Sequence, residues 1–100
     1  MGRLSGKVAF ISGGARGQGA AEALLFAKEG AKVIVGDILD IEGEGIVEAI
    51  NNKGGESRYV HLDVTSKDDW ESAVQEIDKD FGQLHILVNN AGITLRRTVE

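Results

Sequence analysis

The sequence contains no cysteine and no proline. Without cysteine the chain has no disulfide, no zinc-finger ligand pattern and no thiol nucleophile, which fits a reducing compartment. No continuous apolar run approaches the roughly 18 residues that a membrane-spanning helix needs. Residues 1–7 also lack the apolar core of a signal peptide. We therefore expect a cytoplasmic protein that has no membrane partner.

Basic residues are too few and too scattered to form a surface for polyanions. The 100 residues include 11 lysines and arginines against 16 acidic residues, for a formal charge of −5. This balance argues against nonspecific binding to nucleic acid or to an anionic membrane. The length corresponds to one small domain or to part of a larger one. Such a chain can bury roughly two-thirds of its unfolded surface.

Short apolar runs alternate with helical patterns along the chain. The apolar runs predict strands at residues 8–11, 32–37, 58–62 and 85–88. Residues 18–29 form a predicted helix on the spacing of Ala20, Leu24 and Ala27. A second helix is predicted at 41–52, with Leu39, Ile46, Val47 and Ile50 on its inner face, although Gly43 and Gly45 weaken it.

The third helix has the clearest signals. Ser66 can cap its first turn, Asp68 and Asp69 suit the positive end of the helix dipole, and Gly82 closes it. The resulting β-α-β-α-β-α-β order predicts an α/β fold, a Rossmann-type doubly wound parallel sheet with strand order 3-2-1-4. Ligands bind such sheets at the carboxyl ends of the strands, and we expect a crevice between the first and fourth strands.

A glycine-rich turn at residues 12–19, with the sequence SGGARGQG, joins the first strand to the first helix. Gly13 would let the chain turn sharply, and Gly17 and Gly19 have no Cβ, so the backbone can approach a diphosphate closely. The free N–H groups of the first helical turn would face that anion. This setting predicts a nucleotide phosphate site, with an ordinary tight turn as the alternative.

An acidic residue, Asp37, ends the second strand, 18 positions after Gly19. A carboxylate there can accept hydrogen bonds from the adenosine ribose hydroxyls, and it would repel a 2′-phosphate. It therefore favours NAD over NADP, although a solvated loop carboxylate would give the same pattern. Arg16 could pair with a 2′-phosphate, but an exposed arginine is mobile, whereas Asp37 directly opposes a second anion.

These residues resemble the short-chain dehydrogenase/reductase family, and the resemblance covers essentially the whole chain. Residues 12–19 match its cofactor fingerprint, with Ser12 where threonine is usual. Asp63 and Val64 look like its adenine-contacting pair, and residues 89–92, with the sequence NNAG, match its strand-four motif. A methyltransferase can share the glycine turn and the acidic residue, but it is not expected to carry the asparagine motif.

The resemblance implies NAD as cofactor and a role for each matching position. The implied diphosphate contacts are Gly13, Arg16, Gly17, Gln18 and Gly19. Asp37 would hold the adenosine ribose, and Asp63 and Val64 would border the adenine. The positions implied near the cofactor's ribose and the central crevice are Asn90, Ala91 and Gly92, and the asparagines of this motif also have a structural share.

The catalytic residues of the family have no counterpart in residues 1–100. The catalytic serine and the Tyr-x-x-x-Lys pair come later in the family. The one tyrosine, Tyr59, is followed four residues on by Asp63 in place of lysine, so we interpret it as a strand residue. His61 and His85 are interpreted as structural, with no evident partner for His85. No cluster of His, Asp and Glu has the spacing of metal ligands.

The sequence thus leads to three hypotheses. In the first, residues 1–100 are the cofactor-binding portion of an NAD-dependent oxidoreductase that transfers a hydride between an alcohol or carbonyl substrate and the nicotinamide. In the second, the chain is a nucleotide-binding module without catalysis, and in the third it is an inactive assembly fragment. Residues 85–89 would form an exposed apolar edge that pairs with another chain. We expect the isolated chain to be marginally stable, homo-oligomeric and inactive.

Overall fold

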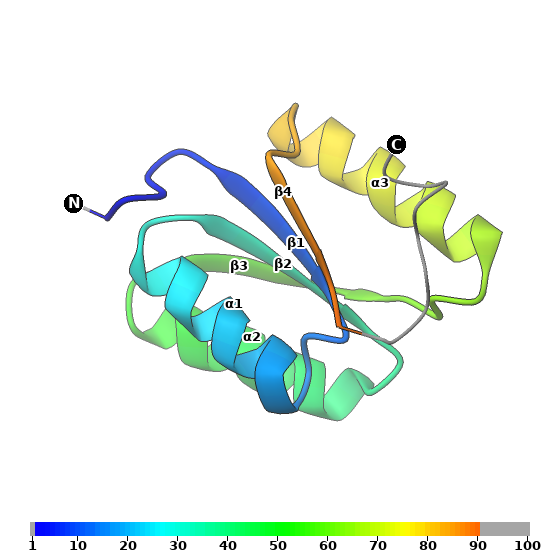
Figure 1. Ribbon diagram of the computed structural model, residues 1–100, viewed down its shortest axis with the longest axis horizontal. Helices are drawn as coiled ribbons and strands as arrows, with labels where there is room; N and C mark the ends of the chain where they lie inside the picture. The colour runs from blue at the N-terminus through cyan, green and yellow to red at the C-terminus, as the bar shows by residue number, and fades with distance from the viewer. Residues whose placement is uncertain (1, 91–100) are drawn as a thin grey trace.

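The structure, a computed structural model, describes residues 2–90. Four strands alternate with three helices in the predicted order (Figure 1). The elements are β1 (Val8–Ser12), α1 (Gly17–Lys28), β2 (Lys32–Asp37), α2 (Asp40–Asn52), β3 (Glu56–His61), α3 (Lys67–Phe81) and β4 (Ile86–Asn89). No helix within residues 2–90 is long and apolar enough to cross a membrane.

The four strands form one parallel sheet in the order β3-β2-β1-β4, which confirms the predicted topology. Helices α1 and α2 lie on one face of this sheet and α3 lies on the other (Figure 1). The carboxyl ends of β1, β2 and β3 therefore meet at one edge, together with the loops that follow them.

The core consists of two layers, because successive residues of a strand point to opposite faces of the sheet. Ala9, Ile11, Val33 and Val35 belong to the cluster under α1 and α2. The alternate positions of the same strands belong to the cluster under α3, which comprises Val8, Phe10, Ile34, Leu62, Trp70, Ala73 and Ile77. Every residue of β1 is buried, whereas all four residues of β4, at the sheet edge, are only half-buried.

The fourth strand begins one residue later than predicted, and His85 has partners that the sequence did not reveal. Its Nδ1 accepts a hydrogen bond from the backbone N–H of Val8 at 2.9 Å, and its Nε2 lies 2.7 Å from Gln83 Oε1. Because Nδ1 accepts, the ring proton resides on Nε2. His85 therefore extends the β1–β4 pairing with a side-chain nitrogen in place of a carbonyl oxygen.

The buried face of α1 differs from the apolar stripe that indicated the helix. Gly19 and Ala23 are its buried residues, whereas Leu24 and Leu25 are 38% and 53% exposed. A Cβ added at Gly19 would lie 2.1 Å from the carbonyl oxygen of Gly13. This close approach of the first turn to the preceding loop sets the rotation of the helix, and the two leucines turn outward as a result.

Candidate functional site

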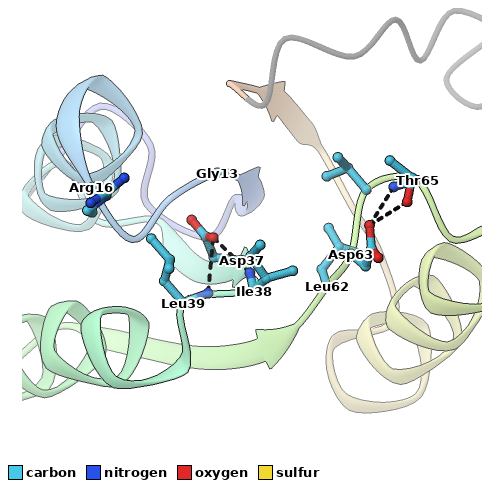
Figure 2. Close-up of a pocket in the computed structure, with 9 residues that line it drawn as sticks. Gly13, Arg16, Asp37, Ile38, Leu39, Leu62, Asp63 and Thr65 are labelled. Carbon is cyan, nitrogen blue, oxygen red and sulfur yellow. Dashed lines mark hydrogen bonds between the residues drawn. The ribbon is translucent and has the colours of Figure 1, made fainter.

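A cleft of about 510 Å³ opens at the carboxyl ends of β1, β2 and β3. It brings together loops that lie far apart in the sequence (Figure 2). Its lining residues are Gly13, Arg16, Asp37, Ile38, Leu39, Leu62, Asp63, Val64 and Thr65. Five of the residues predicted from the sequence therefore share one cavity: Gly13, Arg16, Asp37, Asp63 and Val64.

The glycine turn is anchored to the sheet and then folds tightly against α1. Gly13 has a φ of 68°, a conformation that favours glycine, and its N–H donates to the carbonyl of Gly36 at 2.8 Å. Gly17 has a φ of 58°, and a Cβ added there would have open space around it. At Gly19, in contrast, a Cβ would collide with the carbonyl oxygen of Gly13. Glycine therefore suits position 17 because of its backbone conformation and position 19 because of the close contact.

The first turn of α1 presents N–H groups without a side-chain cap from its own sequence. Arg16 occupies the N-cap position in an extended conformation, and it makes no side-chain hydrogen bond to the helix. The first turn carries no acidic residue. Because a helix N-terminus carries partial positive charge, this end of α1 can accept an anion, and the exposed Arg16 adds a full positive charge beside it.

The carboxylate of Asp37 stands at the centre of the cleft and ties the turn after β2 to the glycine turn. Its Oδ1 accepts from the N–H groups of Ile38 at 2.7 Å and Leu39 at 3.2 Å, and its Oδ2 accepts from Ala15 at 3.1 Å. An ionised carboxylate offers about four acceptor sites. Among contacts within residues 2–90, one acceptor site on Oδ2 is thus left for a donor from a ligand.

The loop after β3 forms the opposite wall of the cleft. The carboxylate of Asp63 accepts from the backbone N–H of Thr65 at 2.9 Å and from its hydroxyl at 2.7 Å, and these bonds lower the pKa of Asp63. The backbone N–H of Asp63 donates to Asp69 at 2.9 Å. The carbonyl of Val64 accepts from Trp70 Nε1 at 2.9 Å. This wall is therefore fixed to α3, and Val64 gives it apolar surface suited to a planar base.

Asn89 and Asn90, the described residues of the asparagine motif, lie beside β1 and outside the lining of this cleft. The hydroxyl of Ser12, which is fully buried, donates to Asn89 Oδ1 at 2.9 Å. The backbone N–H of Asn90 donates to the carbonyl of Ser12 at 3.1 Å, and its side chain donates to Glu22 Oε1 at 2.7 Å. These bonds fasten β4 to β1 and α1. The predicted residues Ala91 and Gly92 lie outside the described residues.

Three of the predicted diphosphate residues do not line the cleft either: Gly17, Gln18 and Gly19. Gln18 is exposed on α1, where its amide donates to Glu22 at 3.3 Å. Leu39 was predicted on the inner face of the second helix, but it is the N-cap of α2 and lines the cleft. Its place just after the acidic residue of β2 is the signal that could have identified it.

Comparisons with known proteins agree with this geometry. The family model for short chain dehydrogenase matches residues 7–100. A 3-alpha-(or 20-beta)-hydroxysteroid dehydrogenase of Mycobacterium bovis is 52% identical over 99% of this chain and 37% of its own length. A 2,5-dichloro-2,5-cyclohexadiene-1,4-diol dehydrogenase of Sphingobium indicum is 47% identical over 91% of this chain and 36% of its own. The chain thus spans well under half the length of these curated relatives.

Solved structures show the same fold. The crystal structure of an Escherichia coli hydroxysteroid dehydrogenase matches with a TM-score of 0.87 and 36% identity, over 91% of this chain and 39% of that one. An NAD+-bound xylitol dehydrogenase matches with a TM-score of 0.86 and 33% identity, over 91% and 35% respectively. The glycine turn, the acidic end of β2 and these matches together establish that the chain belongs to the short-chain dehydrogenase family.

Proposed function

We propose that residues 1–100 form the cofactor-binding portion of an NAD-dependent oxidoreductase that acts on an alcohol or on the corresponding carbonyl compound. The observation that carries this proposal is the meeting of Gly13, Arg16, Asp37, Asp63 and Val64 around one cleft at the carboxyl ends of β1, β2 and β3. The chain belongs to a dehydrogenase family, and the proposed reaction is hydride transfer, the chemistry that a nicotinamide supplies when bound.

The residues fit the adenosine and diphosphate parts of such a cofactor. The uncapped first turn of α1 and the positive charge of Arg16 suit a diphosphate. Asp37 has an acceptor site for a ribose hydroxyl, and the apolar side chain of Val64 suits the adenine. Asn90, Ala91 and Gly92 remain proposed for the side of the crevice between β1 and β4, where the nicotinamide half would lie.

A preference for NAD over NADP follows from the position of Asp37. Its carboxylate would accept from a ribose hydroxyl and repel a 2′-phosphate. We expect Asp37→Asn to weaken NAD binding by about tenfold, the usual effect of losing a hydrogen bond to a charged group. Binding of NADP should stay constant or improve. Calorimetric titration of both cofactors tests this, and equal losses for the two would contradict the proposed ribose contact.

The intact mass of the polypeptide in its natural source is the first measurement for the wider proposal. A mass well above 10.6 kDa would support an oxidoreductase, and the remaining sequence should then supply a tyrosine followed four residues later by a lysine. A mass of 10.6 kDa would contradict the enzymatic proposal and favour a nucleotide-binding module without catalysis.

The two curated relatives, a hydroxysteroid dehydrogenase and a diol dehydrogenase, support an alcohol or carbonyl substrate, because both are named for dehydrogenation of hydroxyl compounds. The substrate itself is proposed only as a class. A homo-oligomer and a cytoplasmic location complete the proposal. The half-buried strand β4 at the sheet edge supports pairing with further chain.

A further inference from the structure

Three side chains outside the cleft lining converge behind the turn that carries Asp37. Tyr59 and His61 are two residues apart in β3, so they point to the same face of the sheet. Both reach Asp40, the first residue of α2. The Tyr59 hydroxyl lies 2.5 Å from Asp40 Oδ1, and His61 Nδ1 lies 2.7 Å from the same oxygen. Asp40 and His61 are more than half exposed, whereas Tyr59 is only partly exposed.

The ring of Tyr59 packs closely against α2 at Gly43, a position that has no side chain. A Cβ added at Gly43 would lie 2.1 Å from Cε1 of this ring. Gly43 is therefore not a weakness of the helix but the space into which the ring fits. Burial, followed by the hydrogen bond and negative charge of Asp40, raises the pKa of Tyr59 above its ordinary value. The hydroxyl thus stays protonated and remains a hydrogen-bond donor.

This hydroxyl also contacts the main chain of Asp37. It lies 2.5 Å from the carbonyl oxygen of Asp37, which accepts in addition from the N–H of Leu62 at 2.9 Å. The single hydroxyl hydrogen serves both this carbonyl and the carboxylate of Asp40. The turn at 37–40 is therefore held at both of its ends by one side chain of β3, while the Asp37 carboxylate caps the N–H groups between them.

We propose that Tyr59 is a positioning residue for the adenosine-ribose site. It acts through the carbonyl of Asp37 and the carboxylate of Asp40, and it fixes the direction in which the Asp37 carboxylate faces the cleft. This inference rests on the proposed ribose contact of Asp37. The expected consequence is specific: loss of the hydroxyl weakens recognition of the ribose hydroxyls more than it weakens binding of the diphosphate and the base.

The test compares ADP with 2′-deoxy-ADP on the full-length polypeptide produced from its own gene. The ratio of their dissociation constants isolates the contribution of one ribose hydroxyl. A general loss of protein stability would weaken the binding of both nucleotides and leave this ratio unchanged. In the unaltered protein we expect a ratio of about ten. In Tyr59→Phe, which keeps the ring, the ratio should fall to about two or three. An unchanged ratio in Tyr59→Phe would overturn the proposal.

Ser57→Ala is the matched control. The Ser57 hydroxyl also joins β3 to α2, with distances of 3.2 Å to the carbonyl of Val47 and 3.0 Å to Asn51 Oδ1. Ser57 lies two residues before Tyr59, nearer the amino end of β3, and it pairs with Val33, four residues before Asp37 in β2. Its removal should leave the ratio unchanged. If Ser57→Ala lowers the ratio as much as Tyr59→Phe does, the effect comes from general strand–helix packing and the positioning role is wrong.

Two further variants separate this inference from the proposed function. Asp37→Asn should bring the ratio close to one, and an unchanged ratio in that variant would remove the ribose contact and the positioning role together. If Asp37→Asn lowers the ratio and Tyr59→Phe does not, the ribose contact stands and only the positioning role fails. Asp40→Asn keeps the shape of the side chain but removes the negative charge that accepts from Tyr59. This variant should therefore lower the ratio in the same direction as Tyr59→Phe.

Discussion

The first turns of α1 and α3 differ in how the partial positive charge of a helix N-terminus is balanced. At α3 the hydroxyl of Ser66 accepts from the N–H of Asp69 at 3.1 Å, and Asp68 and Asp69 place negative charge in the first turn. At α1 the N-cap residue is Arg16, without a side-chain hydrogen bond to the helix and without acidic residues in the first turn. Both helices have the same dipole, but only α3 balances it within its own sequence.

This difference determines which of the two helix N-termini is available to a ligand. Capping and acidic side chains stabilise a helix N-terminus by satisfying its free donors and its partial positive charge. An end that lacks them is less stable in isolation but can bind an anion. In this chain the uncapped end lies beside the cleft that carries Asp37, and the capped end supports the far wall of that cleft through Asp63 and Trp70.

Substitution of Gly19 should have the largest effect on the difference between these two helix ends. In Gly19→Ala the new Cβ would meet the carbonyl oxygen of Gly13 at 2.1 Å. The gain of up to about 1 kcal/mol from alanine in a helix is smaller than the usual overpacking cost of about 1–3 kcal/mol. We expect lower stability and dinucleotide binding weakened by about tenfold or more, because the first-turn N–H groups must move. Denaturant unfolding and calorimetric titration would measure both.

Gly45→Ala is the control for that variant. Gly45 also lies within a helix, but a Cβ there would meet nothing within 4 Å. The substitution should stabilise the protein by up to about 1 kcal/mol and leave cofactor binding unchanged. If Gly19→Ala behaved like Gly45→Ala, the close approach of α1 to the glycine turn would have no role in the site.

Substitution of Ser66 should have an intermediate effect on stability alone. Ser66→Ala removes the cap of α3, which normally costs about 1 kcal/mol of the free energy of unfolding. Because this helix end holds no ligand in the proposed function, the affinity for NAD should change by less than about twofold. Urea unfolding and cofactor titration on the same variant would test this. A tenfold loss of affinity would mean that the two helix ends are not independent.

The first turn of α2 carries the acidic residues Asp40 and Glu42 but has no side-chain cap. The contact of Asp40 with His61 should make a smaller contribution to stability, which depends on pH. The hydrogen bond to Asp40 raises the pKa of His61 above its ordinary 6.5. Burial opposes this hydrogen bond with a smaller effect, and the charges of Asp40, Asp69 and Asp63 each add a still smaller increase. Tyr59 and then His61 lower the pKa of Asp40 below 3.8. The His61 contribution to stability is therefore complete below pH 6.5 and is lost as the pH rises through its raised pKa.

Melting temperatures of the unaltered protein and of His61→Gln, compared from about pH 5.5 to about pH 8.5, would test that sign. The advantage of histidine should be largest at the acidic end and should shrink toward the basic end. The Asp40 contribution is lost only at much lower pH, so it does not interfere. In Asp40→Asn the same comparison should show little dependence on pH, and an advantage that grows with pH would contradict the assignment.

The sequence predicted the strands and α3 well because their signals are local. Apolar runs such as residues 32–37 mark strands that are buried on both faces, and the predicted bounds of β2 agree with the structure. The buried residues of α3, which are Trp70, Ala73 and Ile77, recur at helical spacing, and the cap and closing glycine that indicated this helix are both local. The spacing of Leu24 was misleading, because the rotation of α1 depends on the contact between Gly19 and Gly13 across the turn.

For the site, the sequence indicated Gly13 from the glycine pattern and Asp37 from the acidic end of the second strand, and both residues line the cleft. Asp63 and Val64 came from the family resemblance, and the cleft includes both. The hydrogen bond between the N–H of Ala15 and Asp37 was not predictable, because it depends on how two loops 22 residues apart meet. Tyr59 is a strand residue, as predicted, but its hydrogen bond to the carbonyl of Asp37 was not predictable, because it joins residues that lie 22 positions apart.

The residue pattern was enough to predict the alternation of strands and helices, the parallel order of the sheet, and the sheet edge at which we propose that a nucleotide binds. These features follow from short-range patterns and from the handedness of crossovers. The tertiary structure alone decided which face of α1 is buried, why Gly43 must lack a side chain, and which oxygens of Asp37 already have donors. Each of these depends on distances of a few ångströms between segments far apart in the chain, and no local pattern encodes such distances.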